Sequence, residues 1–118
     1  MPEPARFSVV SEARPQCYLV TVAGEVDAHS ASELRAAVEA GISPQVRLVA
    51  DLSDVTFLDS TGLGVFVTAV KKVQEQGGSL DLVVTSPRVM RVFELTGLDS
   101  MLTIHGDLAA ALAEPISD

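Results

Sequence analysis

The sequence predicts an α/β domain with a mostly parallel mixed sheet, because short apolar segments alternate with amphipathic segments along the chain. The apolar segments are nearly continuous runs, which is typical of strands that are buried on both faces. The amphipathic segments begin at cap-forming residues and end near glycine, as helices commonly do. At 118 residues the chain has the size of one domain. We therefore expect a single domain over 1–118, with its core between about residues 7 and 113.

The first two strands are expected at Phe7–Val10 and Tyr18–Gly24, and the short polar segment between them suits a hairpin. This hairpin would place an antiparallel strand at the N-terminal edge of the sheet. The first helix is expected to begin at Ser30, which forms a capping-box pattern with Glu33, and to end at Gly41.

The same alternation continues to the end of the chain, and each helix has a start or stop signal. The remaining elements are expected as a strand at Val46–Leu52, a helix from near Ser60 to Gly77-Gly78, a strand at Leu80–Val84, a helix from Ser86-Pro87 to Gly97, a strand around Leu102–Ile104 and a short helix from Asp107 to Ala113. Residues from Pro115 onward are expected to form a frayed tail. In the second helix, helical spacing assigns Leu63, Phe66 and Val67 to the core, together with the preceding Leu58.

The charge and hydropathy of the chain limit its partners. Acidic residues outnumber basic ones by 16 to 8, so the formal net charge is −8. This balance argues against nucleic acid as a partner, because neutralising phosphates requires Lys and Arg. No apolar run is long enough to span a bilayer, and the first residues lack the order of a signal peptide. We therefore expect a cytoplasmic protein with no membrane partner.

Residues that commonly carry catalysis or bind metal are few and scattered. A single cysteine, Cys17, excludes an intramolecular disulfide, and we expect it to be semi-buried because no His or Lys adjoins it in sequence. His29 and His105 belong to no metal-binding spacing and to no Ser-His-Asp order. We expect both to be solvated loop residues. The sequence therefore predicts no catalytic residue, no metal and no cofactor.

The most informative segment is the turn Asp59-Ser60-Thr61-Gly62, where a strand-like run gives way to a helical pattern. The first three residues are all typical of helix starts. Two hydroxyls also lie where the helix dipole favours negative charge. The turn is therefore a helix cap, a phosphorylation switch, or both. The glycine pair, Gly62 and Gly64, lacks the rest of a nucleotide-binding motif, and we assign it to close packing.

A second acidic turn, Gly24-Glu25-Val26-Asp27, ends the second strand. The carboxyl ends of parallel strands open at the same edge of a sheet, where such folds place their sites. Asp27 and Ser60 are therefore expected to be neighbours in space. The alternative is that Asp27 only caps or stabilises the turn before the first helix, and that Asp59 does the same for the second.

Several blocks together resemble the anti-sigma factor antagonists, the bacterial branch of the STAS domain family, over about Phe7 to Ala113. The blocks are Gly24-Glu25-Val26-Asp27, Asp51-Leu52-Ser53-Asp54-Val55, Phe57-Leu58-Asp59-Ser60-Thr61-Gly62-Leu63-Gly64, Gly77-Gly78-Ser79-Leu80 and Val92-Phe93-Glu94-Leu95-Thr96-Gly97-Leu98. The resemblance implies a single STAS-like domain. It also implies that the protein is a regulatory binding protein and not an enzyme.

The resemblance also assigns roles to residues. Ser60 matches the serine that is phosphorylated by the partner, an anti-sigma factor with serine kinase activity. The unphosphorylated antagonist binds this partner and frees its sigma factor, the phosphorylated form is released, and a serine phosphatase restores it. Asp27 and Asp59 match acidic positions that flank the acceptor. Thr61 varies with serine in the family, so a second acceptor there is left open.

The expected partner-binding surface is the pair of turns with the exposed side of the second helix. Its residues are Asp27, Ala28, His29, Asp59, Ser60, Thr61 and Gly62. Two rival functions are open. One is a STAS-type module that senses or scaffolds within a signalling complex without direct control of a sigma factor. The other is a small hydrolase with Ser60 as nucleophile, for which the sequence offers no convincing base.

Overall fold

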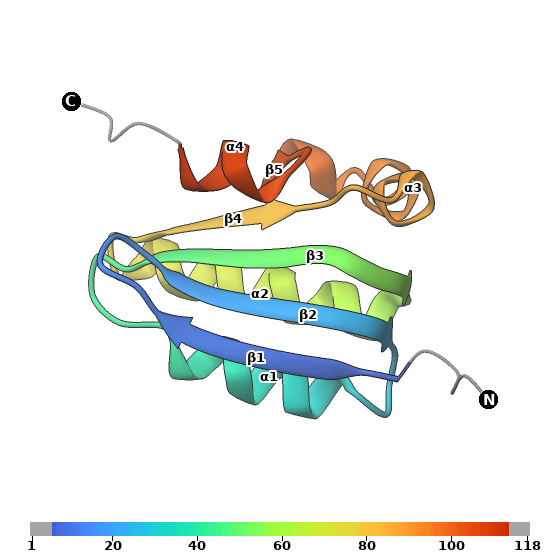
Figure 1. Cartoon of the computed structure of the whole chain (residues 1–118), viewed down its shortest axis with the longest axis horizontal. Helices are drawn as coiled ribbons and strands as arrows, with labels where there is room; N and C mark the ends of the chain where they lie inside the picture. The colour runs from blue at the N-terminus through green and yellow to red at the C-terminus, as the bar shows by residue number, and fades with distance from the viewer. Residues whose placement is uncertain (1–5, 114–118) are drawn as a thin grey trace.

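The computed structural model describes residues 6–113 and confirms the α/β fold (Figure 1). The expected tail from Pro115 lies outside the described residues. Strands and helices alternate after an initial hairpin. The elements are β1 (Ser8–Ala13), β2 (Tyr18–Val26), α1 (Ala31–Ala40), β3 (Arg47–Leu58), α2 (Ser60–Glu75), β4 (Ser79–Val83), α3 (Pro87–Thr96), a 3₁₀ turn (Leu98–Ser100), β5 (Thr103–His105) and α4 (Leu108–Leu112).

The five strands form one sheet in the order β1-β2-β3-β4-β5. The β1–β2 pair is antiparallel and the other three pairs are parallel. The prediction of a mostly parallel mixed sheet with an antiparallel N-terminal edge strand is therefore confirmed. Because β2, β3 and β4 run in the same direction, the turns that follow them open at one edge of the sheet.

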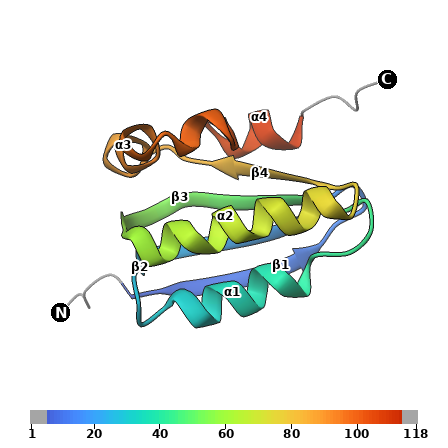
Figure 2. The ribbon, with the colours of Figure 1, turned by 180° about the vertical axis from the view of Figure 1, so that it is seen from behind.

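Helices α1 and α2 lie side by side against one face of the sheet (Figure 2). The main hydrophobic core lies between the strands and helices α1, α2 and α3, and Phe66 of α2 and Phe93 of α3 are its largest fully buried side chains. The short helix α4 lies against the other face, over β3, β4 and β5. It covers a small second cluster of buried residues that includes Cys17 and Val49. Most of the core therefore lies on one face of the sheet, and the turns at the edge are anchored to it.

Strand β3 is longer than the sequence predicts, because it continues past Leu52 to Leu58. Val55 and Leu58 remain buried, and Gly24 and Val26 of β2 still pair with them. Two register shifts interrupt this pairing, one between Asp51 and Asp54 and the other between Val55 and Phe57, as β-bulges do. The strand therefore runs directly into α2, with Asp59 alone between the two elements.

The start of α1 differs from the predicted capping box. Ser30 is the residue before the helix, but its side chain makes no cap hydrogen bond to α1. Its hydroxyl faces back toward β2, where it accepts from Asp27 N–H and contacts the carbonyl oxygen of Glu25. The capping-box prediction is wrong because the Ser30 hydroxyl forms its hydrogen bonds with Asp27 and Glu25, which precede the helix.

In α2 the predicted core residues Leu63 and Phe66 are buried, as is Leu58 before the helix. Val67 is only half-buried and lies at the border of the buried stripe. The assignment of Val67 to the core is therefore wrong. A helix of this kind buries a stripe rather than every apolar residue.

A buried ionic cluster joins the last strands to α4, and it corrects the prediction for His105. This histidine ends β5, and its Nε2 lies 3.1 Å from Oδ2 of the buried Asp81 on β4. Arg47 of β3 places Nη2 3.1 Å from the same carboxylate oxygen and also donates to the carbonyl of Ala111. One carboxylate therefore ties together three strands, and the arginine that it holds reaches α4.

We predict that Arg47→Ala lowers the free energy of unfolding by about 2 kcal/mol, because it leaves a buried carboxylate with one partner fewer and frees the α4 carbonyl. Urea denaturation of wild type and variant measures this loss. Lys72→Ala is the matched control, because it breaks the exposed ion pair between Lys72 and Glu39. The control should stay close to the wild-type value, since exposed pairs contribute little. Equal losses in the two variants would show that the cluster adds no more than a surface pair.

Candidate functional site

The Ser60 turn lies at the carboxyl edge of the sheet, between the end of β3 and the start of α2. Asp59 has an extended backbone, and its Oδ1 accepts a hydrogen bond of 3.0 Å from Gly62 N–H. Asp59 is therefore the residue that caps the helix. Ser60 and Thr61 occupy the first two helical positions and are exposed. Within residues 6–113 no group forms a hydrogen bond with the Ser60 hydroxyl, so capping does not engage it.

The Asp27 turn joins β2 to α1 and is built around the Asp27 carboxylate. Its Oδ1 accepts from the backbone N–H groups of His29 at 2.9 Å and of Ser30 at 3.2 Å. These bonds leave Ala28 and His29 exposed at the tip of the turn. The expectation that His29 is a solvated loop residue is confirmed. Asp27 itself is half-buried.

The two turns are directly joined. The backbone N–H of Asp59 donates to the carbonyl of Val26 at 3.1 Å, and Val26 pairs with Leu58 in the sheet. Gly62 in the first turn of α2 also packs against both of these side chains. The turns that precede α1 and α2 are therefore neighbours at one edge, as the parallel arrangement predicts.

Each of the two aspartates accepts hydrogen bonds from backbone N–H groups with one carboxylate oxygen. Oδ1 of Asp59 caps α2 by accepting from Gly62 N–H, whereas Oδ1 of Asp27 accepts from His29 and Ser30 N–H and so stabilises the turn before α1. Within the described residues, no hydrogen bond engages the second oxygen of either carboxylate. Two carboxylates thus add negative charge beside the turn that carries an exposed hydroxyl, and capping does not exclude a further role.

A family model described as the STAS domain matches residues 8–111, which is most of the chain. The chain belongs to the STAS domain family. The resemblance on which the sequence analysis relied is therefore confirmed.

Several relatives of this STAS domain are described as anti-sigma factor antagonists. It is 45% identical over 85 residues to an anti-sigma-B factor antagonist of Bacillus subtilis (strain 168), a match that covers 72% of this chain and 78% of that protein. The crystal structure of an anti-sigma factor antagonist from Mycobacterium paratuberculosis has a TM-score of 0.83 and 31% identity, covering 91% of this chain and 92% of that one. The anti-sigma factor antagonist SpoIIAA in its unphosphorylated form has a TM-score of 0.71 at 22% identity, covering 89% and 93%, and supports the fold alone.

The two glycines of the STAS motif have different environments. A Cβ at Gly62 would lie 2.6 Å from both Leu58 Cδ1 and Val26 Cγ1, so the prediction of close packing is confirmed there. A Cβ at Gly64 would meet nothing within 4 Å, and this residue is exposed. The close-packing prediction is therefore wrong for Gly64. That glycine lies one helical turn after Ser60, on the same side of α2.

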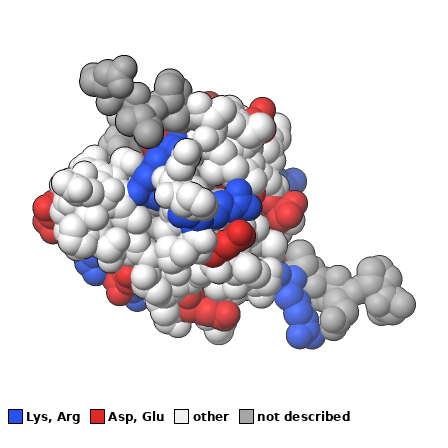
Figure 3. Space-filling view, turned by 60° about the vertical axis from the view of Figure 1, so that its left-hand side comes forward, with Lys and Arg blue, Asp and Glu red and all other residues white. Residues whose placement is uncertain are grey.

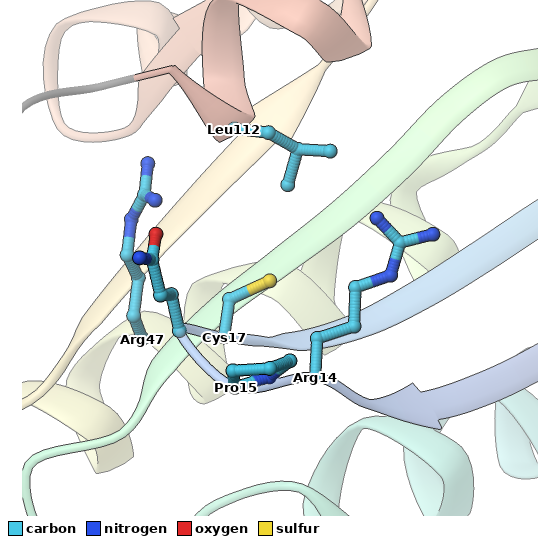
Figure 4. Close-up of a pocket in the computed structure, with 6 residues that line it drawn as sticks. Arg14, Pro15, Cys17, Arg47 and Leu112 are labelled. Atoms are coloured by element: carbon cyan, nitrogen blue, oxygen red, sulfur yellow. The ribbon is translucent and has the colours of Figure 1, made fainter.

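A cavity of about 220 Å³ lies at the opposite end of the sheet from Ser60. Figure 4 shows Arg14 and Arg47 on its two sides, with the Cys17 sulfur between them and Leu112 of α4 above. Figure 3 brings this end forward and shows basic atoms gathered near the centre of the face, with acidic groups around them. Cys17 is 9% exposed, which confirms a semi-buried side chain. The cavity shares no lining residue with the Ser60 turn.

The described residues show two further absences. Within residues 6–113 no group of three or more His, Cys, Asp or Glu side chains is placed to hold a metal ion. In the same part of the chain, no helix has both the length and the apolar character that crossing a membrane requires.

The role of Ser30 at this edge of the sheet was not predicted from the sequence. Ser30 looked like a helix cap, but the structure buries its hydroxyl inside the turn that presents Ala28 and His29. Its small size and its position before a helix fit both roles equally well. Only the course of the backbone from Glu25 to Ser30 distinguishes them.

The two motif glycines give a matched pair of substitutions with opposite expected signs. Gly62→Ala should lower the free energy of unfolding by about 1–3 kcal/mol, because the new methyl group overlaps two core side chains. Gly64→Ala should raise it by about 0.5–1 kcal/mol, because alanine favours the helix and has open space. Urea titration measured by circular dichroism tests both. A change of the same sign in the free energy of unfolding of both variants would contradict the conclusion that Gly62 is closely packed and Gly64 is not.

Proposed function

We propose that this STAS domain is an anti-sigma factor antagonist whose binding is switched by phosphorylation of Ser60. The observation that carries the proposal is the Ser60 hydroxyl, which is exposed at the first position of α2 while Asp59 performs the capping. Support also comes from relatives described as anti-sigma factor antagonists. The proposed partner is an anti-sigma factor that is itself a serine kinase.

In the unphosphorylated state the domain binds this partner through the two joined turns. Ala28 and His29 project from one turn, and Ser60 and Thr61 from the other. Both turns are fixed by hydrogen bonds from backbone N–H groups to an aspartate carboxylate, so little conformational entropy is lost when they bind. Engagement of the anti-sigma factor releases its sigma factor for transcription.

Phosphorylation is a transfer from ATP held by the partner. Ser60 Oγ attacks the γ-phosphorus, the bond between that phosphorus and the bridging oxygen of ADP breaks, and a base of the kinase takes the hydroxyl proton. The product carries about −1.5 to −2 charge units at neutral pH. The free N–H groups at the start of α2 offset part of this charge, so the domain stays folded.

The phosphate weakens binding through charge and desolvation. A partner surface that fits a neutral hydroxyl would instead meet a dianion on the turn that carries Asp59 and adjoins the Asp27 turn. Desolvation and like-charge repulsion both oppose that contact. Because about 1.4 kcal/mol corresponds to a tenfold change in affinity, a modest penalty is enough for a switch. A serine phosphatase then hydrolyses the phosphoester, which releases inorganic phosphate and restores the hydroxyl.

We predict that Ser60→Ala binds the anti-sigma factor but is not released when ATP is added, whereas Ser60→Asp binds at least about tenfold more weakly than wild type. The partner is obtained by capture from an extract of the source organism, identified by mass spectrometry and purified. Affinity is then measured by titration calorimetry with and without ATP.

Ser11→Ala is the control for the loss of an exposed serine, because Ser11 lies on the edge strand β1 away from both turns. It should bind and be released like wild type. Intact-mass analysis after incubation with kinase and ATP should show one added phosphate in wild type and Ser11→Ala, and none in Ser60→Ala. Binding that is unchanged in both Ser60 variants, with and without ATP, would overturn the switch. Capture of a signalling complex without a sigma-factor regulator would favour a scaffolding module instead.

Phosphorylation of Ser60 should leave the secondary structure of the domain intact. The phosphate lies at a helix N-terminus, where its charge is favourable, and Asp59 still caps the helix. The far-UV circular dichroism spectrum of the phosphorylated protein should therefore overlay that of the unphosphorylated protein. A large loss of helical signal would instead indicate that the switch works by melting α2.

A further inference from the structure

We propose that the buried hydroxyl of Ser30 is a positioning group for the partner-binding turn, an inference that rests on the proposed function. Ser30 lies between the Asp27 turn and α1, and it is 7% exposed. Buried polar side chains are retained where their hydrogen bonds fix a conformation. The question is what conformation this hydroxyl fixes.

All of the hydrogen bonds of the Ser30 hydroxyl lie within the turn. Its oxygen accepts from the backbone N–H of Asp27 at 2.9 Å. Its proton is best placed to reach the carbonyl of Glu25 at 3.1 Å, with longer contacts to the carbonyl and carboxylate of Asp27. A single side chain therefore spans the chain from the end of β2 to the start of α1.

The hydroxyl does not stabilise the helix that it precedes. No bond joins the Ser30 side chain to α1, and the first helical N–H groups use backbone carbonyls, with Ala31 donating to Asp27 and Leu34 to Ser30. Removing the hydroxyl would thus leave the helical hydrogen bonds in place. The groups that lose a partner are Glu25 C=O at the end of β2 and Asp27 N–H in the turn that follows it.

The held turn carries the predicted contact residues of one side of the partner-binding surface. Asp27 Oδ1 binds the N–H groups of His29 and Ser30, so the carboxylate, Ala28 and the imidazole are presented as one unit. The preceding residue, Val26, accepts from Asp59 N–H and so connects this unit to the Ser60 turn. The buried Ser30 hydroxyl therefore fixes the position of the Asp27 turn relative to the Ser60 turn, and it does so from inside the turn rather than from the contact surface.

The test compares variants as substrates of the purified anti-sigma factor kinase. For Ser30→Ala, we expect the KM for phosphorylation of Ser60 and the Kd for the kinase to rise about tenfold, while kcat stays within about twofold of wild type. A turn that must be ordered on binding costs affinity, but the Ser60 hydroxyl itself is unchanged. Thermal unfolding is measured in parallel for every variant.

Ser86→Ala is the matched control, because Ser86 also contributes a hydroxyl bond to a backbone N–H, at the start of α3. It should lower the melting temperature by several degrees while KM and Kd stay at wild-type values. A second pair separates the hydroxyl from packing. Ser30→Thr keeps the hydroxyl and Ser30→Val replaces it with a methyl group of similar shape, so Thr should retain a KM within about threefold of wild type and Val should resemble Ala.

Two results would overturn the positioning role: a KM of wild-type size in both Ser30→Ala and Ser30→Val, or an equal rise in KM in Ser86→Ala. Either result would leave the Ser60 switch standing, because wild type would still be bound and phosphorylated. Failure of wild type to bind or to accept phosphate would instead overturn the proposed function, and the role of Ser30 with it.

Discussion

The contact of Gly62 with Val26 and Leu58 is the constraint on which the rest of the site depends. A Cβ at Gly62 would overlap both neighbours, so the first turn of α2 can pack this closely against Val26 and Leu58 only with glycine at this position. The hydrogen bond from Asp59 N–H to Val26 C=O fixes the same junction through the backbone. Because of these two contacts, Ser60 stands at the edge of the sheet beside the turn that carries Asp27. Were the helix displaced outward, the two turns would separate and the charge of one would matter less to the other.

Most of the fold was predictable from sequence because local patterns and the tertiary arrangement agree. Apolar strands, helix caps and terminal glycines all indicated the same alternation, and the mixed sheet followed from it. The wrong predictions concern elements whose structure depends on contacts with residues far away in the sequence. Strand β3 continues past Leu52 because β2 still pairs with Asp54, Val55, Phe57 and Leu58. His105 pairs with Val83 of β4 and contacts the buried Asp81. No local pattern encodes a partner that lies far away in the chain.

The candidate site was predictable to a similar extent, and for similar reasons. The motif located both turns, and parallel topology brought them to one edge. The motif did not show that Gly62 and Gly64 differ, since this depends on which side of α2 faces the sheet. The sequence also left open whether the aspartates cap or act on a partner. In the structure Asp59 caps α2 and Asp27 stabilises the turn before α1, each with one oxygen, so these structural roles leave the second oxygen of each carboxylate without a hydrogen bond within residues 6–113.

A switch based on charge works best on a domain that does not change shape. If phosphate on Ser60 altered the fold, its effect on binding would depend on the stability of the whole domain and would vary with temperature. Here Asp59 supplies the cap, so the serine hydroxyl is spare, and phosphate can be added without loss of a structural hydrogen bond. At the far end of the sheet, the Asp81 cluster holds β3, β4, β5 and α4 together independently of these turns. In the proposed switch, phosphate on Ser60 would therefore act on a partner through local charge, while the packing that positions Ser60 stays the same.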